Sequence, residues 1–154
     1  MWKQNKLLFG NASAQQFDDA KKWSCYVNEH IDGLAAIDAS AKKENFFAAS
    51  KILNITNIIA ATSNRSAAYI ERTAVETTGV HCTIPITGKK TFKSGKKSYA
   101  AISGKHSFVT TADIPSSLKS SDGMDIVFFL NKASLERIIS ANFLEISIKD
   151  CNFN

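Results

Sequence analysis

The sequence has few cysteines and few arginines, and each shortage excludes a class of protein. Its three cysteines, Cys25, Cys82 and Cys151, lie far apart and form no Cys-x-x-Cys pair. Neither a disulfide framework nor a zinc knuckle is therefore expected. Arginine occurs only at positions 65, 72 and 137, and the other basic residues are lysines. Because the planar guanidinium suits phosphate and base recognition, this balance disfavours a dedicated nucleic-acid surface.

Long apolar runs are also missing. Leu7-Leu8-Phe9 is too short for the core of a signal peptide, and no stretch approaches the length of a membrane span. We therefore expect a soluble, cytoplasmic protein. The 154 residues, of which 44% are hydrophobic, fit one folded domain. We expect this domain to have an N-terminal arm over 1–14, a core over 15–140 and a tail over 141–154.

Two segments have the three- and four-residue spacing of amphipathic helices. Ser13-Ala-Gln-Gln16 has the form of a capping box. The helix predicted after it carries Asp18 and Asp19 in its first turn and ends at Asp32-Gly33. The second predicted helix begins near Asn131, with Asn131 or Ser134 as its cap. Its apolar stripe consists of Leu135, Ile138 and Ile139.

Between the helices, the pattern is that of short β-strands. Apolar and other residues alternate over 80–86, where Pro85 indicates an edge or a bulge. The alanine-rich segment 45–53 fits either a helix or a strand, and its β-branched residues favour a strand. The nearly all-apolar run 124–130 predicts a central strand. The other predicted strands are 34–37, 58–62, 68–73 and 108–111.

Glycine turns separate several of these strands. They are Thr87–Lys90, Ser94–Lys96 and Ser103–Lys105, and in each the glycine is expected to supply a positive φ. Many short strands without room for crossover helices indicate a mainly β fold. We predict an antiparallel jelly roll or β-sandwich barrel flanked by an N-terminal and a C-terminal helix.

A lysine-rich stretch runs along the glycine turns, with two aromatic residues, Phe92 and Tyr99, interleaved. Its lysines are Lys89, Lys90, Lys93, Lys96, Lys97 and Lys105. One interpretation is a platform on which nucleic-acid bases stack. The interpretation that we favour is a solvated outer face, on which lysines discourage edge pairing while Phe92 and Tyr99 point inward.

The residues that carry catalysis or metal binding are scattered. His81 and Cys82 are adjacent in a predicted strand and so point to opposite faces. His30 and His106 lie elsewhere, and we predict no metal site and no cofactor. A triad built in space from Cys82 and His106 is possible but is not indicated by spacing. We expect Asp113, Asp122 and Asp125 to cap turns.

Two further motifs of enzymes are missing from the sequence. It contains no Gly-x-Ser-x-Gly elbow. The Ser-Gly-Lys turns lack the full Gly-x₄-Gly-Lys-Ser/Thr pattern of a phosphate-binding loop, and neither is expected to open a helix. The sequence therefore predicts no catalytic residues.

The order of elements is accompanied by particular residues at particular places. The first helix carries the aromatic pair Phe17 and Trp23, and a following strand carries Arg72. A glycine turn at Gly104, a loop with Asp113 and Pro115, and a closing strand and helix over 126–135 come after them. In these features, residues 15–140 resemble the N-terminal ligand-sensing domain of AraC-type bacterial transcription regulators, which is a cupin-like jelly roll.

The sequence departs from that family in two ways. Lys105 stands where the family has an acid after its glycine, which puts a side-chain hydrogen bond of that turn in doubt. The family also continues into a C-terminal domain with two helix-turn-helix units, and no such segment follows here. Either the chain is an excised domain, or it stands alone and does not bind promoters as the family does.

The resemblance implies a non-enzymatic domain that senses a small organic effector and forms a homodimer. It implies DNA contact only through an attached C-terminal domain, and dimerisation through Leu135, Ile138 and Ile139. The predicted inner face supplies the candidate ligand-binding residues: Tyr69, Arg72, Cys82, Ile84, Phe108 and Phe128. An inward Arg72 needs a carboxylate partner or a ligand, whereas an outward one is merely solvated. The alternatives are a stand-alone cupin-like enzyme and a basic single-stranded nucleic-acid-binding module.

Overall fold

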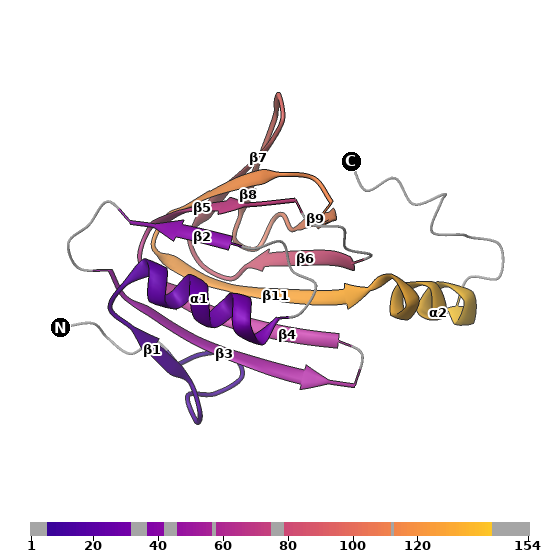
Figure 1. The fold of residues 1–154 in the computed structure, drawn as a ribbon, viewed down its shortest axis with the longest axis horizontal. Coiled ribbons are helices and arrows are strands. Elements are labelled where there is room, and N and C mark those ends of the chain that lie inside the picture. The colour runs from indigo at the N-terminus through magenta and orange to yellow at the C-terminus, as the bar shows by residue number, and fades with distance from the viewer. Residues whose placement is uncertain are drawn as a thin grey trace.

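The computed structural model describes residues 6–31, 37–41, 46–56, 58–74, 79–111 and 113–142. The side chains at 132, 138, 139, 141 and 142 are outside this description. Eleven strands form two antiparallel sheets, and a helix lies near each end of the described chain (Figure 1). The mainly β architecture of antiparallel strands, which the strand spacing predicted, is confirmed.

The larger sheet has six strands, in the order β1-β3-β4-β11-β6-β9. The run 124–130 lies within β11, between β4 and β6, so the prediction of a central strand is confirmed. The ambiguous segment 45–53 contributes to β3, a strand. The bounds are β1 (Gln15–Phe17), β3 (Ala48–Ile55), β4 (Ile58–Arg65), β11 (Gly123–Asn131), β6 (Gly79–Pro85) and β9 (Phe108–Thr111).

The smaller sheet has five strands, in the order β2-β5-β10-β7-β8. Strand β10 was not predicted, because Leu118 is its only apolar residue and one residue gives no alternation. The predicted strand 34–37 lies mostly outside the described residues. The bounds are β2 (Ile37–Ser40), β5 (Ala68–Arg72), β10 (Ser116–Ser120), β7 (Lys89–Ser94) and β8 (Lys97–Ile102).

The first helix, α1 (Ala20–His30), begins later than the capping box predicted. Asp19, not Ser13, is its N-cap, and the Asp19 carboxylate accepts hydrogen bonds from the amides of Lys21 and Lys22 at 2.8 and 2.9 Å. Gln15 and Gln16 instead form β1, which pairs with β3. The correction has a local cause, since aspartate caps a helix at least as well as serine.

The second helix, α2 (Lys132–Asn142), follows β11 directly. The Asn131 side-chain oxygen accepts a hydrogen bond from the amide of Ser134 at 2.7 Å, so the predicted cap at Asn131 is confirmed. Neither described helix has the length and apolar character that a membrane crossing requires.

Two predictions about turns and proline are tested by the structure. Gly88, Gly95 and Gly104 all have positive φ, as expected. Gly88 is also sterically required, because a Cβ there would lie 2.5 Å from the carbonyl oxygen of Asp122. Pro85 was predicted at an edge or a bulge. Strand β6 as a whole lies between β11 and β9, but Pro85 lies beyond the residues of β6 that pair with β9, so a missing N–H there costs no ladder bond.

The hydrophobic core lies between the sheets and beneath α1. Trp23 and Val27 of α1 belong to a buried cluster that includes Ala61 of the larger sheet and Ile70 and Leu118 of the smaller sheet. The Trp23 indole Nε1 donates to the Ser50 hydroxyl at 2.8 Å. Because α1 packs against β2 and touches β1 and β3, it covers the side of the barrel where the edge strands β1 and β2 lie (Figure 1).

The segment before β1 packs on β3. Leu7 is fully buried, and the Lys51 ammonium on β3 donates to the carbonyl oxygen of Phe9 at 3.0 Å. The expected division into an arm, a core and a tail stays a prediction.

Candidate functional site

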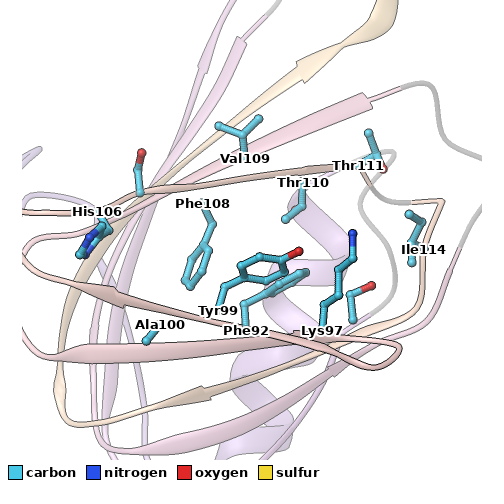
Figure 2. A pocket seen from close by; sticks show the side chains of 12 residues that line it. Phe92, Lys97, Tyr99, Ala100, His106, Phe108, Val109, Thr110, Thr111 and Ile114 are labelled. Atoms are coloured by element: carbon cyan, nitrogen blue, oxygen red, sulfur yellow. The ribbon is translucent and has the colours of Figure 1, made fainter. Parts of the chain in front are cut away.

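The opposite side of the barrel carries a cavity. The six-stranded sheet ends at β9 and the five-stranded sheet ends at β8, so these two edge strands belong to different sheets. Between them, and over β7, lies a cavity of about 360 Å³ that opens to solvent (Figure 2). An open edge between two sheets is a place where a ligand can contact both sheets at once.

Three aromatic residues form the apolar wall of this outer cavity. Phe92 on β7 and Phe108 on β9 have ring centroids 5.5 Å apart, and Tyr99 on β8 lies across from Phe92 in register. Figure 2 shows the three rings pointing into one space, with Lys97 beside them. Phe92 is buried as predicted, whereas Tyr99 is 39% exposed because the cavity opens beside it.

Polar groups complete the lining of the outer cavity. Lys97 contributes an ammonium, and Thr110 and Thr111 on β9 contribute hydroxyls. His106 also lines the cavity, but Figure 2 shows it at the side away from Lys97. An apolar cavity with a few polar groups is the usual composition of a small-molecule site.

The barrel interior holds an ion-paired group. Arg65 donates from Nη1 to Oδ2 of Asp125 at 2.7 Å and from Nη2 to the Ser120 hydroxyl at 3.4 Å. Lys90 donates to the same carboxylate oxygen. All three charged residues are buried. One carboxylate therefore serves two cations.

The charges of this group shift one another's pKa values. Burial by itself raises the pKa of Asp125, but Arg65 and Lys90 outweigh burial and hold that pKa at about 2. Burial, reinforced by the Arg65 cation, lowers the pKa of Lys90 to about 8. At neutral pH, Asp125 is therefore fully ionised and Lys90 is mostly protonated.

These buried charges correct two sequence predictions. Lys90 was expected on the solvated outer face, and Asp125 was expected to cap a turn. Both instead point into the barrel, as does Arg65, which was not predicted as a site residue. A signal for Asp125 is present in the sequence, because a lone charge within the apolar run 124–130 must be paired when its strand is central.

The Arg72 side chain faces the interior, which is one of the two orientations that the sequence left open. It lies at the end of β5, paired with Ile37 and Ser116, and its guanidinium carbon lies 6.0 Å from the Phe92 ring centroid. Among the described residues, no carboxylate lies within ion-pair distance of it. Its Nε is buried without a hydrogen bond, and burial lowers its pKa to about 10.

The inner face of β6 is the reverse of the predicted one. His81 and Thr83 are fully buried, and the His81 ring meets Phe129 edge-on at 4.8 Å. Cys82 and Ile84, the predicted inner residues, are half-buried on the other face. Burial, helped by the nearby Arg72 cation, lowers the pKa of His81 to about 3, so its imidazole is neutral.

The other predicted ligand-binding residues lie in different parts of the barrel. Phe108 lines the outer cavity, and Phe128 lies opposite Cys82, on the face of β11 away from Asp125. Tyr69 points outward from β5 and is 43% exposed. Of the six candidates, the structure places Phe108 at the outer cavity and Arg72 in the interior. Their role in binding stays a prediction.

Two other predictions concern metal binding and dimerisation. Within the described part of the chain, no three residues of the histidine, cysteine, aspartate and glutamate types gather as a metal would require. Leu135 is half-buried on α2, and the side chains of Ile138 and Ile139 lie outside the described residues. The dimerisation stripe stays a prediction.

Comparison with known proteins yields structural matches only. No protein family and no curated protein matches the sequence. Among solved structures, the chain is similar to the AraC-like transcriptional activator CuxR, with a TM-score of 0.63 and 13% identity. That match covers 83% of this chain and 51% of CuxR, so the chain spans about half the length of that protein.

Weaker matches are to cupin domains and cupin proteins. One is the cupin domain of an XRE-family transcriptional regulator from Enterobacter cloacae, with 14% identity, a TM-score of 0.45, and coverage of 55% of this chain and 95% of that one. Another is KdgF from Halomonas sp., with 13% identity, a TM-score of 0.47, and coverage of 61% and 86%. The match to CuxR, at 13% identity, shows a similarity of fold.

Proposed function

We propose that this chain is the sensing domain of a transcription regulator and that it binds a small organic molecule in the outer cavity. The observation that supports this proposal is the cavity of about 360 Å³ between the edge strands of a cupin-like barrel. Its size lies within the range of known small-molecule sites, roughly 300–1,000 Å³. The similarity to CuxR agrees with such a role.

The chemistry of the lining indicates the class of ligand. Phe92, Phe108 and Tyr99 would contact an apolar or aromatic body, and Lys97 with the threonines of β9 would contact polar substituents. The described lining contains no carboxylate, and we propose a role in binding, not in catalysis. The expected partner is thus a small, partly aromatic effector.

The proposed mechanism follows from the position of the cavity. A ligand that touches both β8 and β9 bridges the open edges of two sheets. Such a ligand stabilises the arrangement of the two sheets in which β8 and β9 are close enough for it to contact both strands. Such a ligand shifts an equilibrium only by its difference in affinity between the two arrangements. The attached DNA-binding domain and a homodimer through α2 belong to this proposal as well.

Thermal denaturation against a panel of aromatic and aliphatic metabolites tests the proposal. A compound that binds only the folded state raises Tm by mass action. We expect Tyr99→Ala to abolish the rise. Tyr69→Ala is the matched control, because Tyr69 is similarly exposed but points away from the cavity. Equal loss in both variants, or no response to any compound of the panel, contradicts the proposal.

The homodimer is tested separately by sedimentation. We expect wild-type protein to sediment as a dimer and Leu135→Glu to sediment as a monomer. A wild-type monomer at all concentrations contradicts the dimer without affecting the ligand site.

A further inference from the structure

A second, smaller cavity of about 50 Å³ lies inside the barrel, between α1 and both sheets. Arg65 on β4, Arg72 on β5 and Thr83 on β6 line it, together with Asp125 and the hydroxyls of Ser50 and Ser63. Trp23 of α1 closes one side. The polar side chains of this inner cavity thus come from strands of both sheets.

The charges around the inner cavity do not balance. Arg65, Arg72 and Lys90 contribute three positive charges, Asp125 contributes one negative charge, and His81 is neutral. The described group therefore carries a net charge of +2. A buried cation without a partner is strongly unfavourable, and the usual remedy is an anion in contact with it. The inner cavity has room for one.

Unused hydrogen-bond donors point to the same conclusion. Arg65 donates from Nη1 and Nη2, but its Nε is buried without an acceptor. The Nε of Arg72 is also buried without an acceptor, and both arginines line the inner cavity. Arg65 itself is only 2% exposed. Two unused guanidinium donors beside a cavity with an excess of positive charge form a site for acceptor oxygens.

We propose that the inner cavity binds the carboxylate group of a small organic acid. The volume of the inner cavity, about 50 Å³, leaves room for a small anion, and a carboxylate is the smallest organic anion that can present two oxygens to a guanidinium. The flat carboxylate matches the planar donor edge of arginine. This site is separate from the outer cavity of the proposed function, and neither proposal requires the other.

Arg72 gives the inner cavity a route to solvent. The residue is half-buried, and it also lines a shallow open groove where β5, β7 and β10 end, beside Lys93 and Ser116. A small anion can therefore approach Arg72 without the barrel opening. Ordered water is the competing occupant, because water satisfies Nε but leaves the excess charge in place.

The three arginines of the chain make a direct test by NMR practical. Arg65, Arg72 and Arg137 give three Nε–Hε signals, and Arg137 is exposed on α2, which makes it an internal control. Acetate and formate are titrated into uniformly ¹⁵N-labelled protein against chloride at constant ionic strength. We expect saturable shifts for Arg65 and Arg72 and none for Arg137. Equal, unsaturated shifts of all three signals, or no shift, overturn the proposal.

Thermal denaturation of matched variants identifies the site. Acetate at about ten times its Kd should raise the wild-type Tm by roughly 3–6 °C. We expect Arg72→Gln to lose this rise, and the variant should fold because Arg72 makes no ion pair in the described chain. Lys97→Gln, in the outer cavity, should keep the rise. Loss of the rise in Lys97→Gln but not in Arg72→Gln overturns the inner site.

Phosphate and sulfate distinguish a carboxylate site from a general anion site. We expect neither to reproduce the acetate response at equal ionic strength, because a doubly charged tetrahedral anion loses more hydration on burial than a carboxylate does. A phosphate response equal to that of acetate overturns the assignment to carboxylates. Because Arg72→Gln and Lys97→Gln distinguish binding at the inner cavity from binding at the outer cavity, failure of the metabolite panel leaves this test unaffected, and the reverse also holds.

Discussion

The Trp23 indole Nε1 donates a 2.8 Å hydrogen bond to the Ser50 hydroxyl and so links helix α1 to strand β3. Ser50 in turn lies 2.7 Å from the Ser63 hydroxyl on β4. The Arg65 guanidinium carbon lies 5.1 Å from the Trp23 ring centroid. The helix that covers one side of the barrel is thus coupled to the charged interior.

Ser50→Ala tests this link. The substitution leaves the buried indole N–H without an acceptor, and we expect a loss of about 1–3 kcal/mol in the free energy of unfolding. The measurement is urea denaturation at neutral pH, and the exposed Ser98→Ala on β8 is the control. In a Trp23→Phe background, Ser50→Ala should cost less, because no indole N–H remains to be satisfied. Equal costs in both backgrounds would show that the hydrogen bond contributes nothing.

Asp125→Asn tests the buried ion pairs. Without the carboxylate charge, the buried cations Arg65 and Lys90 lose their partner, and we expect a loss of about 3–5 kcal/mol. The exposed Asp113→Asn is the control and should be near neutral. Thermal and urea denaturation measure both variants. A change below about 1 kcal/mol for Asp125→Asn would contradict the described pairing, since removing one partner of a buried pair is costly.

The lowered pKa of His81 predicts that the folded state loses stability in acid. Its folded pKa of about 3 lies below the ordinary value of 6.5, so between these pH values the unfolded state binds the extra proton. Stability should therefore fall as pH decreases from 6.5 toward 3, by up to about 1.4 kcal/mol per pH unit from this one group. Above pH 6.5 the group has no effect.

The variant His81→Leu isolates this contribution. Leucine is similar in size and cannot bind a proton, so the fall in unfolding free energy between pH 7 and pH 5 should be smaller than in wild type. His30→Gln, which alters an exposed histidine of α1, is measured beside it as the matched histidine variant. Identical slopes for His81→Leu and wild type would show that His81 is not held neutral.

Asp19→Ala tests the observed start of α1. Two backbone amides lose their acceptor, and we expect a loss of about 1 kcal/mol. Asp18→Ala, which removes only the partner of an exposed ion pair with Lys22, should have a much smaller effect. Ser13→Ala should have little effect, whereas a cost as large as that of Asp19→Ala would restore the capping box that the sequence predicted.

Local patterns in the sequence predicted much of the barrel. The apolar run of β11 indicated a central strand, and the glycine turns indicated the β6–β7, β7–β8 and β8–β9 connections. These signals are local, because a buried strand needs apolar residues on both faces and a tight turn needs positive φ. Strand β10 escaped prediction because its pairing with β5 and β7, not its own composition, makes it a strand.

The face of β6 shows where the sequence pattern failed. Alternation placed Cys82 and Ile84 inside because they are the more apolar set. The structure places His81 and Thr83 inside, next to a group of charged residues. Alternation reports only that the two faces of a strand differ. Which face turns inward depends on the chemistry of the interior, and here that interior is partly polar.

The sequence by itself determined the periods of the strands and helices and the positions of the glycine turns. It also determined that Arg72 needs a partner if its side chain faces inward. Only the tertiary structure brought Arg65, Lys90 and Asp125 together, because they lie on β4, β7 and β11, far apart along the chain. It also placed β8 and β9, edges of different sheets, on either side of one cavity. Strand pairing over long sequence separations decides such neighbours, and no local pattern encodes it.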